Sequence, residues 1–186
     1  MNAIPLLWLP ILLATVFVFA ASAIVQMVLK WHAADYHGFS NEDEVAAAMR
    51  SGNPAPGIYA IPYCGDMKDM GSAAMQEKYR RGPIVRILLR RGESPSLGKP
   101  LLQWFVFCLV VSLVCALVAA PLLGTAANAH LVFHTTGLAA ILGYAAGPFV
   151  QGIWCCQPWR TVFKDSADGI LYAIVTGATF AWLWPH

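Results

Sequence analysis

The sequence predicts an α-helical membrane protein with four transmembrane helices and a small α/β segment between the first and second of them. Hydrophobic residues make up 58% of the 186 residues and charged residues only 12%, whereas soluble domains carry about 25% charged residues. The apolar residues are concentrated in four long stretches, and all twelve Lys and Arg residues fall between these stretches. This pattern indicates a membrane protein rather than a soluble domain.

The basic residues also predict the orientation of the chain. Ten of the twelve lie between Lys30 and Lys99, and the other two are Arg160 and Lys164. Because basic residues in short loops stay in the cytoplasm during insertion, both termini are expected outside. The tryptophans agree, because each falls at an expected helix end, where amphipathic rings are stable: Trp8, Trp31, Trp104, Trp154, Trp159, Trp182 and Trp184.

The expected transmembrane helices follow the apolar stretches and must cross a hydrocarbon core of roughly 30 Å. Their ranges are 4–29, 101–123, 129–153 and 167–184. Pro148 is expected to bend the inner end of the third helix. A short cytoplasmic loop over 154–166 is expected before the fourth helix. That helix also has the composition to begin earlier, near Pro158, with Lys164, Asp165 and Asp168 at the inner interface.

Residues 30–100 are expected to form a cytoplasmic cap and linker. Ser40 and the acidic residues after it predict a helix that continues to Arg50, and residues 72–81 have helical composition. Residues 57–63 are expected to be extended. Residues 84–91 (IVRILLRR) fit a strand with alternating faces or a short basic helix on the lipid surface, and we favour the strand. Residues 92–100 are expected to be a linker.

Three histidines are candidates for a metal or haem site at the outer ends of the helices. His130 and His134 are four residues apart, so they share one face of the third helix, and His186 ends the chain at the same level. Imidazoles at one depth are ligands that zinc, copper or haem iron accept. The alternative is that these side chains only hydrate a helix end, and no cofactor is predicted.

A second group combines sulfur and imidazole ligands that suit Cu(I). Packing under a small cap is the interpretation we favour for this group: His32, His37, Cys64, Met67, Met70 and Met75. The neighbours Cys155 and Cys156 are candidates for lipidation or redox chemistry, with interfacial packing as the alternative. Cys108 and Cys115 are expected only to pack.

Two stripes of small residues predict close helix packing. One lies on the third helix and one on the fourth: Ala139, Gly143 and Gly147, and Ala173, Gly177 and Ala181. Small residues let backbones approach closely inside a membrane. The third and fourth helices are therefore expected to form a tight antiparallel hairpin through these faces.

Catalysis and transport receive less support. The common catalytic motifs are missing, and an enzyme would have to draw on residues with no sign of convergence: Asp66, Asp69, His32, His37 and Cys64. A channel for small solutes would need a polar path, for which the spans offer few residues: Gln26, Ser22, Ser112, Thr176 and Thr179. If these face one another a channel gains support, and if they scatter it loses support.

Four runs resemble a group of bacterial multi-span membrane proteins of no known activity: HAADYHGFSNEDEVAAAMR, PGIYAIPYC, QEKYRRGP and QPWRTVFKDSADGILYAIVTGATFAWLWP. The resemblance covers most of the chain. It implies a location in the bacterial inner membrane, with no activity, cofactor or site attached.

The function expected from the sequence is that of a non-enzymatic accessory or scaffold protein in the lipid bilayer. Its cytoplasmic cap would contact a membrane-protein partner, another copy of itself or anionic lipid. Five arginines are the expected contact residues, because basic clusters next to a membrane attract anionic head groups: Arg80, Arg81, Arg86, Arg90 and Arg91. They can also serve only to fix topology. The net charge of +2 does not favour a nucleic-acid partner. A redox protein using the outer histidines is the alternative function, and a channel or transporter is the third.

Overall fold

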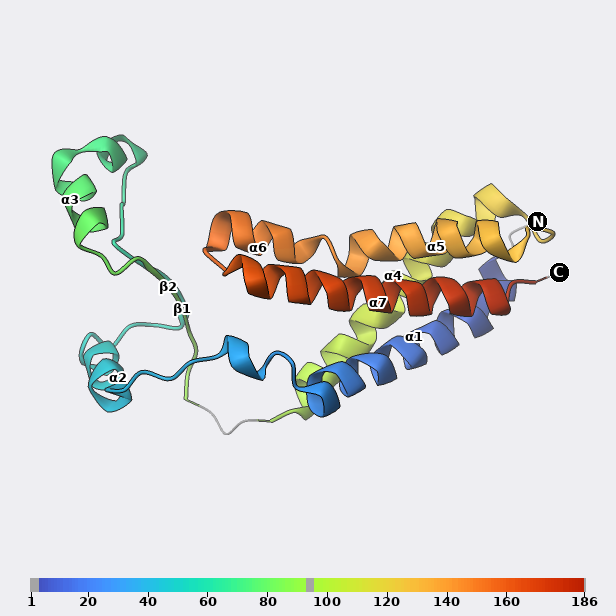
Figure 1. Cartoon of the computed structure of the whole chain (residues 1–186), viewed down its shortest axis with the longest axis horizontal. Coiled ribbons are helices and arrows are strands. Elements are labelled where there is room, and N and C mark those ends of the chain that lie inside the picture. Colours follow the sequence, from blue (N-terminus) through green and yellow to red (C-terminus); the bar gives the residue numbers. More distant parts are fainter. Residues whose placement is uncertain (1–3, 93–95, 186) are drawn as a thin grey trace. The chain divides into compact units, whose positions relative to one another are not determined.

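The computed structural model describes residues 4–92 and 96–185 and shows a mostly helical chain with one small sheet (Figure 1). The chain divides into two compact units. The first comprises residues 1–36 and 96–186 and is called the bundle below. The second comprises residues 37–95 and is called the insert.

Long helices make up the bundle. The first is α1 (Trp8–Ala23), which is preceded by a 3-10 turn over Ile4–Leu7 and continued by a π-helix over Ile24–Leu29. The others are α4 (Gly98–Leu123), α5 (Ala129–Tyr144), α6 (Gly147–Cys155) and α7 (Trp159–Trp182). Among the described residues, three segments are long and apolar enough to cross a membrane: Pro5–Leu29, Gly98–Leu123 and Ala129–Cys155.

Local chemistry explains where these helices begin and end. Gly124, with φ of 62°, ends α4 in a conformation that favours glycine. The Asn128 side chain then accepts a hydrogen bond from the Leu131 N–H at 2.8 Å and caps α5. The third expected span is interrupted after Tyr144, and Pro148 lies in the first turn of α6, where its missing N–H costs no helical hydrogen bond.

The fourth helix begins before residue 167 and matches the alternative start near Pro158. Residues 159–166, which fall in the expected loop, form the first two turns of α7, and Pro158 occupies the capping position. Proline is compatible with this start because its φ is preset and no N–H is required there. Lys164, Asp165 and Asp168 are therefore held on a rigid helix.

The closest helix packing in the bundle joins α5 and α7, which run side by side and antiparallel (Figure 1). A Cβ at Gly169 would lie 2.5 Å from the Tyr144 carbonyl oxygen, and one at Gly177 would lie 2.9 Å from that of Phe133. Backbones this close tolerate only glycine, because any side chain would push the helices apart.

The small-residue stripe expected on the third span does not make this contact. A Cβ at Gly143 would meet Val111 of α4, and one at Gly147 would meet nothing within 4 Å. The reason is geometric: the face of α5 turned to α7 carries Phe133, Gly137 and Tyr144, and Gly147 belongs to α6. Ala139 packs partly buried against the core. On α7, Ala173 is buried in the core near the backbone of Gly137, and Ala181 is partly buried.

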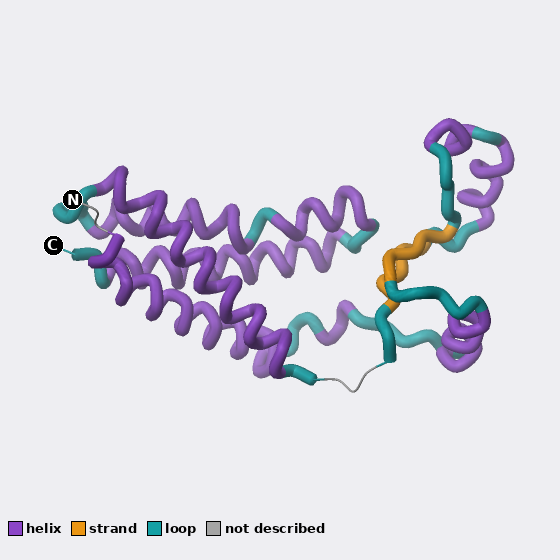
Figure 2. Tube along the Cα trace, turned by 180° about the vertical axis from the view of Figure 1, so that it is seen from behind, coloured by secondary structure: helices purple, strands orange, loops and turns teal. Residues whose placement is uncertain are grey.

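The insert contains two short helices and a two-stranded antiparallel sheet (Figure 2). The order is α2 (Glu42–Ser51), β1 (Gly57–Ile61), α3 (Ala73–Arg81) and β2 (Val85–Leu89). The strand interpretation of residues 84–91 therefore matches the structure. In the register of the sheet Tyr59 lies opposite Ile87, and Ile58 lies opposite Leu88.

Candidate functional site

One end of the bundle holds a cluster of ionisable side chains that comes from two distant parts of the sequence. The π-helix ends at Lys30, whose left-handed conformation (φ of 51°) turns the chain, and a 3-10 turn over Ala33–Asp35 follows. This turn brings His32 and Asp35 against the start of α7. Single-turn π segments are frequent at functional sites.

Lys164 and Asp35 form the first pair of the cluster. The Lys164 Nζ lies 2.7 and 2.9 Å from the two Asp35 carboxylate oxygens and 2.8 Å from the Trp31 carbonyl oxygen. Lys164 is therefore held by one carboxylate and one backbone carbonyl oxygen. The hydrogen bonds from Lys164 hold the pKa of Asp35 below its usual value of 3.8.

His32 and Asp168 form the second pair. The His32 Nε2 lies 2.8 Å from Asp168 Oδ2, and the same oxygen accepts a hydrogen bond from the Gln26 amide at 3.2 Å. The other ring nitrogen of His32 faces Asp35 Oδ2 at 3.3 Å and Asp165 Oδ1 at 3.7 Å. His32 thus has carboxylate oxygens at both ring nitrogens. Its side chain is 12% exposed and that of Asp168 only 7%.

The cluster carries more negative than positive charge. It contains three carboxylates, from Asp35, Asp165 and Asp168, against one ammonium from Lys164 and the imidazole of His32. With all three carboxyl groups ionised, the net charge of these five groups is −1 when His32 is protonated and −2 when it is neutral. Removing charges from water costs free energy unless they are paired, so this excess distinguishes the cluster from a simple ion pair.

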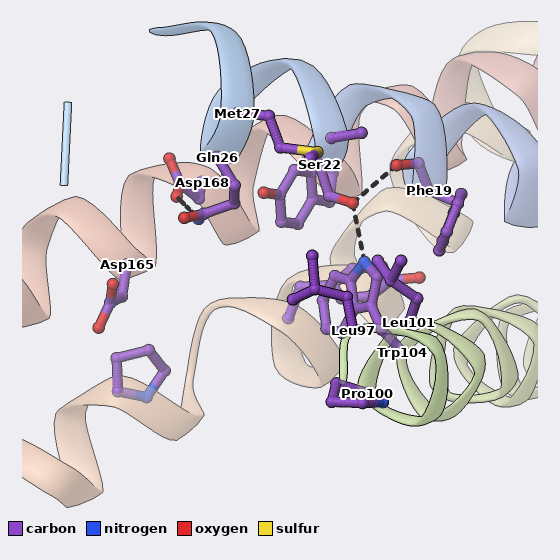
Figure 3. Close-up of a pocket in the computed structure, with 14 residues that line it drawn as sticks. Phe19, Ser22, Gln26, Met27, Leu97, Pro100, Leu101, Trp104, Asp165 and Asp168 are labelled. Atoms are coloured by element: carbon purple, nitrogen blue, oxygen red, sulfur yellow. Dashed lines mark hydrogen bonds between the residues drawn. The ribbon is translucent and has the colours of Figure 1, made fainter. Parts of the chain in front are cut away.

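A cavity of about 450 Å³ opens beside the cluster. Figure 3 shows Asp165 and Asp168 toward one end and Trp104 and Ser22 toward the other. The Trp104 indole N–H donates to the Ser22 hydroxyl at 2.8 Å. Most of the other lining residues are apolar or aromatic, and they come from several helices of the bundle: Phe19, Met27, Leu97, Leu101, Tyr144 and Tyr172.

The outer histidines lie together as their spacing predicts. The Nε2 atoms of His130 and His134 are 3.0 Å apart on the exposed side of α5, which is a hydrogen bond between one protonated and one unprotonated nitrogen. His186 lies outside the described residues. Within the part of the chain that the structure describes, no three His, Cys, Asp or Glu side chains form a group that could hold a metal ion.

The sulfur and imidazole group is divided between the two units. His32 belongs to the bundle and contacts Asp168 instead, whereas Cys64 and the three methionines belong to the insert. There Met75 is buried, while Met67 is 77% exposed. The Cys64 thiol donates to the Asp66 carbonyl oxygen. Cys108 and Cys115 are buried in the core of the bundle, and Cys155 and Cys156 end α6.

The polar residues that would line a channel have separate partners. Thr176 and Thr179 donate to carbonyl oxygens one turn back in α7, and Ser22 donates to the Phe19 carbonyl oxygen. Gln26 reaches Asp168, and the Ser112 hydroxyl is buried with no hydrogen-bond partner among the described residues. These contacts give no support to a continuous polar path.

The five arginines expected to contact lipid or a partner are all exposed. Arg80 and Arg81 end α3 and contact Glu77 at 3.4 and 2.9 Å. Arg86 lies within β2, and Arg90 and Arg91 follow the strand. They form a basic segment over residues 80–91 without an acidic residue.

Sequence reasoning did not assemble the cluster around His32 and Asp168. Two signals were present: Lys164 and Asp168 are four residues apart on one helix face, and His32 and Asp35 are three residues apart. Yet 136 residues separate His32 from Asp168, and no local pattern pairs them.

Three described segments are long and apolar enough to cross a bilayer, which indicates a multi-pass membrane protein. Comparisons with known proteins do not narrow this class further. No family model matches the chain, and neither a curated protein nor a solved structure is similar to it.

Proposed function

We propose that this chain is a four-span protein of the bacterial inner membrane with both termini outside and residues 30–100 in the cytoplasm. The distribution of basic residues supports this orientation. The 24 residues of α7 have a length of about 36 Å, since a helix rises 1.5 Å per residue. The 14 residues of α7 after Asp168 measure about 21 Å, so a fourth crossing of a roughly 30 Å core would take in Asp168 together with its hydrogen-bond partners His32 and Gln26.

The topology can be tested with the native cysteines. An impermeant maleimide added to intact spheroplasts should leave Cys64 unlabelled, and the same reagent added to inverted vesicles should label it. Cys64→Ser is the control that assigns the signal. Labelling of Cys64 in intact spheroplasts would contradict the orientation.

We infer that the insert of this protein binds a partner protein, so that the chain acts as a non-enzymatic accessory subunit. The observation that carries this proposal is the missing core of the insert. Among its described residues Met75 is the one hydrophobic side chain that is buried. An isolated two-stranded sheet is marginally stable in water, and exposed apolar surface of this kind marks interaction sites.

Protein is favoured over lipid as the covering surface because both faces of the sheet expose apolar residues. Ile58 and Leu88 are 62% and 73% exposed on one face, and Tyr59 and Ile61 are 38% and 49% exposed on the other. A membrane surface covers one face only. A protein partner can cover both faces or add a strand to an open edge, since β1 and β2 each have one neighbour.

The test is site-specific photocrosslinking in native membranes. A photoreactive residue in place of Leu88 should form an adduct with one protein, and the complex should copurify at fixed stoichiometry in mild detergent. The same residue in place of Lys68, which lies outside the sheet, is the matched control. Adducts with phospholipid alone, or equal adducts from both positions, would contradict the proposal.

The lipid alternative is tested with the arginines. Substituting Arg80, Arg86 and Arg90 with Gln removes three charges, each worth about 1 kcal/mol at an anionic surface. If the insert rests on lipid, binding of the protein to anionic liposomes should fall sharply. Under our proposal this binding changes little in physiological salt, while the Leu88 crosslink to protein persists.

A second candidate function, metal or haem binding at the outer face, is favoured by one observation. The Nε2 atoms of His130 and His134 converge to 3.0 Å on one helix face, and two imidazoles spaced in this way can share a metal ion. A purified protein that carries metal or colour, lost in His130→Ala, would support this function. A metal-free protein that does not bind added Zn²⁺ would exclude it.

A further inference from the structure

The cavity beside the ionisable cluster has acidic and aromatic surfaces together. Asp165 and Asp168 contribute to its lining, whereas the basic side chains Lys164 and His32 lie outside it. The Lys164 ammonium is paired with Asp35 and with the Trp31 carbonyl oxygen. The surface presented to an occupant of the cavity is therefore anionic at this end.

Asp168 contributes a carboxylate to this end of the cavity. The Gln26 amide and the His32 ring both reach its Oδ2, and the Trp31 indole is a further donor to this carboxyl. The side chain is 93% buried, because only 7% of it is exposed. A buried carboxylate oxygen is stabilised by a donor, and a charged donor gives the stronger hydrogen bond.

Aromatic rings supply the rest of the recognition surface. The centroids of Trp104, Tyr144 and Tyr172 are separated by 5.9 to 6.2 Å from one another. All three residues line the cavity. The face of an aromatic ring attracts cations, and most strongly when water is excluded. Aromatic faces next to carboxylates are the arrangement that recognises an ammonium group.

We propose that the cavity between α1, α4, α5 and α7 binds an ammonium group carried on an apolar body. The ammonium would lie at Asp165 and Asp168, and the apolar body would lie along Trp104, Met27 and Leu101. An anion is disfavoured by the carboxylates. A bare metal ion is disfavoured by the apolar walls, and a neutral ligand would not balance the excess of carboxylates at this end of the cavity.

The size of the cavity fits this class of ligand. Small-molecule sites have volumes of about 300–1,000 Å³ and are mostly apolar with a few polar groups, and this cavity measures about 450 Å³. Ammonium groups on apolar bodies come from two sources in a cell: free hydrophobic amines and the head groups of aminophospholipids. Both have the chemistry that the site recognises.

Binding can be measured with three matched probes on the full-length protein in nanodiscs. They are 4-phenylbutylamine, 4-phenylbutanol and 5-phenylpentanoate, which have similar apolar bodies and positive, neutral and negative heads. Quenching of Trp fluorescence or calorimetry should show the amine binding at least tenfold more tightly than the alcohol, with no binding of the carboxylate. Equal affinity for the amine and the alcohol would overturn the proposal.

Substitutions in the cavity lining test whether the amine binds in this cavity. Asp165→Asn removes one carboxylate charge from a side chain that is 34% exposed and should weaken binding of the amine at least fivefold. Ala23→Phe, which adds a ring to the cavity lining, should abolish binding while the melting temperature stays near that of the wild type. Asp69→Asn in the insert is the matched control and should leave affinity unchanged. Unaltered affinity in a folded Ala23→Phe protein would place the probe elsewhere and overturn the proposal.

Lipid-binding measurements show whether the natural occupant is an aminophospholipid or a free amine. Native mass spectrometry of protein from nanodiscs containing phosphatidylethanolamine and phosphatidylglycerol should retain the aminophospholipid if lipid is the natural occupant. This retention should be lost in Ala23→Phe. Retention of neither lipid, together with tight amine binding, would support a free amine. If the wild type retained phosphatidylglycerol in preference to phosphatidylethanolamine, and Ala23→Phe did not, the site would not be an ammonium site.

Discussion

The bundle and the insert expose apolar side chains to a similar degree, but with different consequences. Leu142 on α5 is 74% exposed, and Leu88 on β2 is 73% exposed. In a membrane protein an exposed leucine on a spanning helix faces lipid, where it is stable. Under the proposed topology the same residue on a short strand of the insert faces water, and exposed apolar surface of this kind is typical of interaction sites.

The two units also differ in what holds them together. Helices α5 and α7 approach until only glycine fits, and buried residues from α1, α4, α5 and α7 form one core. The insert has the hydrogen bonds of one strand pair and a single buried hydrophobic residue among those described. Side-chain packing stabilises the bundle, whereas the insert depends mainly on local hydrogen bonds and, under our proposal, on a partner.

The largest expected difference between the units is in hydrogen exchange. Amides of β1 and β2 should exchange at least a thousandfold faster than those in the middle of α5 and α7, because local opening needs little free energy where few contacts are broken. Exchange mass spectrometry in nanodiscs and in detergent separates lipid shielding from structure. Similar protection of strands and helices in detergent would break the comparison.

The next largest difference is expected in the loss of stability when one large side chain is truncated in each unit. Phe180→Ala removes a ring that is fully buried in the bundle, which should destabilise the protein by about 3–5 kcal/mol. Leu88→Ala should change stability by about 0.5 kcal/mol or less. Denaturant titration of both variants without a partner measures this. A large loss in Leu88→Ala would reveal a core in the insert.

Glycine substitutions sharpen the comparison inside the bundle itself. A methyl group at Gly169 meets the backbone of Tyr144 and Ala145, so Gly169→Ala must separate α5 from α7 and should cost about 1–3 kcal/mol. Gly147→Ala is the control, because no atom lies within 4 Å of its Cβ. Thermal unfolding should distinguish the two. Equal melting temperatures would show that the helices pack elsewhere.

The smallest expected effect concerns pH and the Lys164–Asp35 pair. Because Lys164 lowers the pKa of Asp35 in the folded protein, folding is stabilised above the unfolded value of 3.8, and this contribution disappears as the pH falls through the lower folded value. Melting temperatures of wild type and Lys164→Gln should therefore differ at pH 6 and converge in strong acid. If the difference in melting temperature stayed constant across this pH range, protonation of Asp35 would not be linked to folding through Lys164.

The sequence was informative wherever a property depends on neighbours along the chain. The composition placed the apolar segments, Pro148 marked the interruption between α5 and α6, and alternation over residues 84–91 matched β2. The sequence was less informative about which face of each helix packs against its neighbour. The stripe through Gly143 and Gly147 looked equivalent to the one through Ala173 and Gly177, but Gly137 and not Gly143 faces α7.

The sequence by itself determined that this is a chain of long apolar helices with its basic residues gathered between them, because hydropathy and charge act residue by residue. Only the tertiary structure decided that His32 meets Asp168, that Gln26 reaches the same carboxylate and that a cavity lies beside them. These contacts join segments more than 130 residues apart. They depend on how one helix crosses another, which side-chain packing sets and no local pattern records.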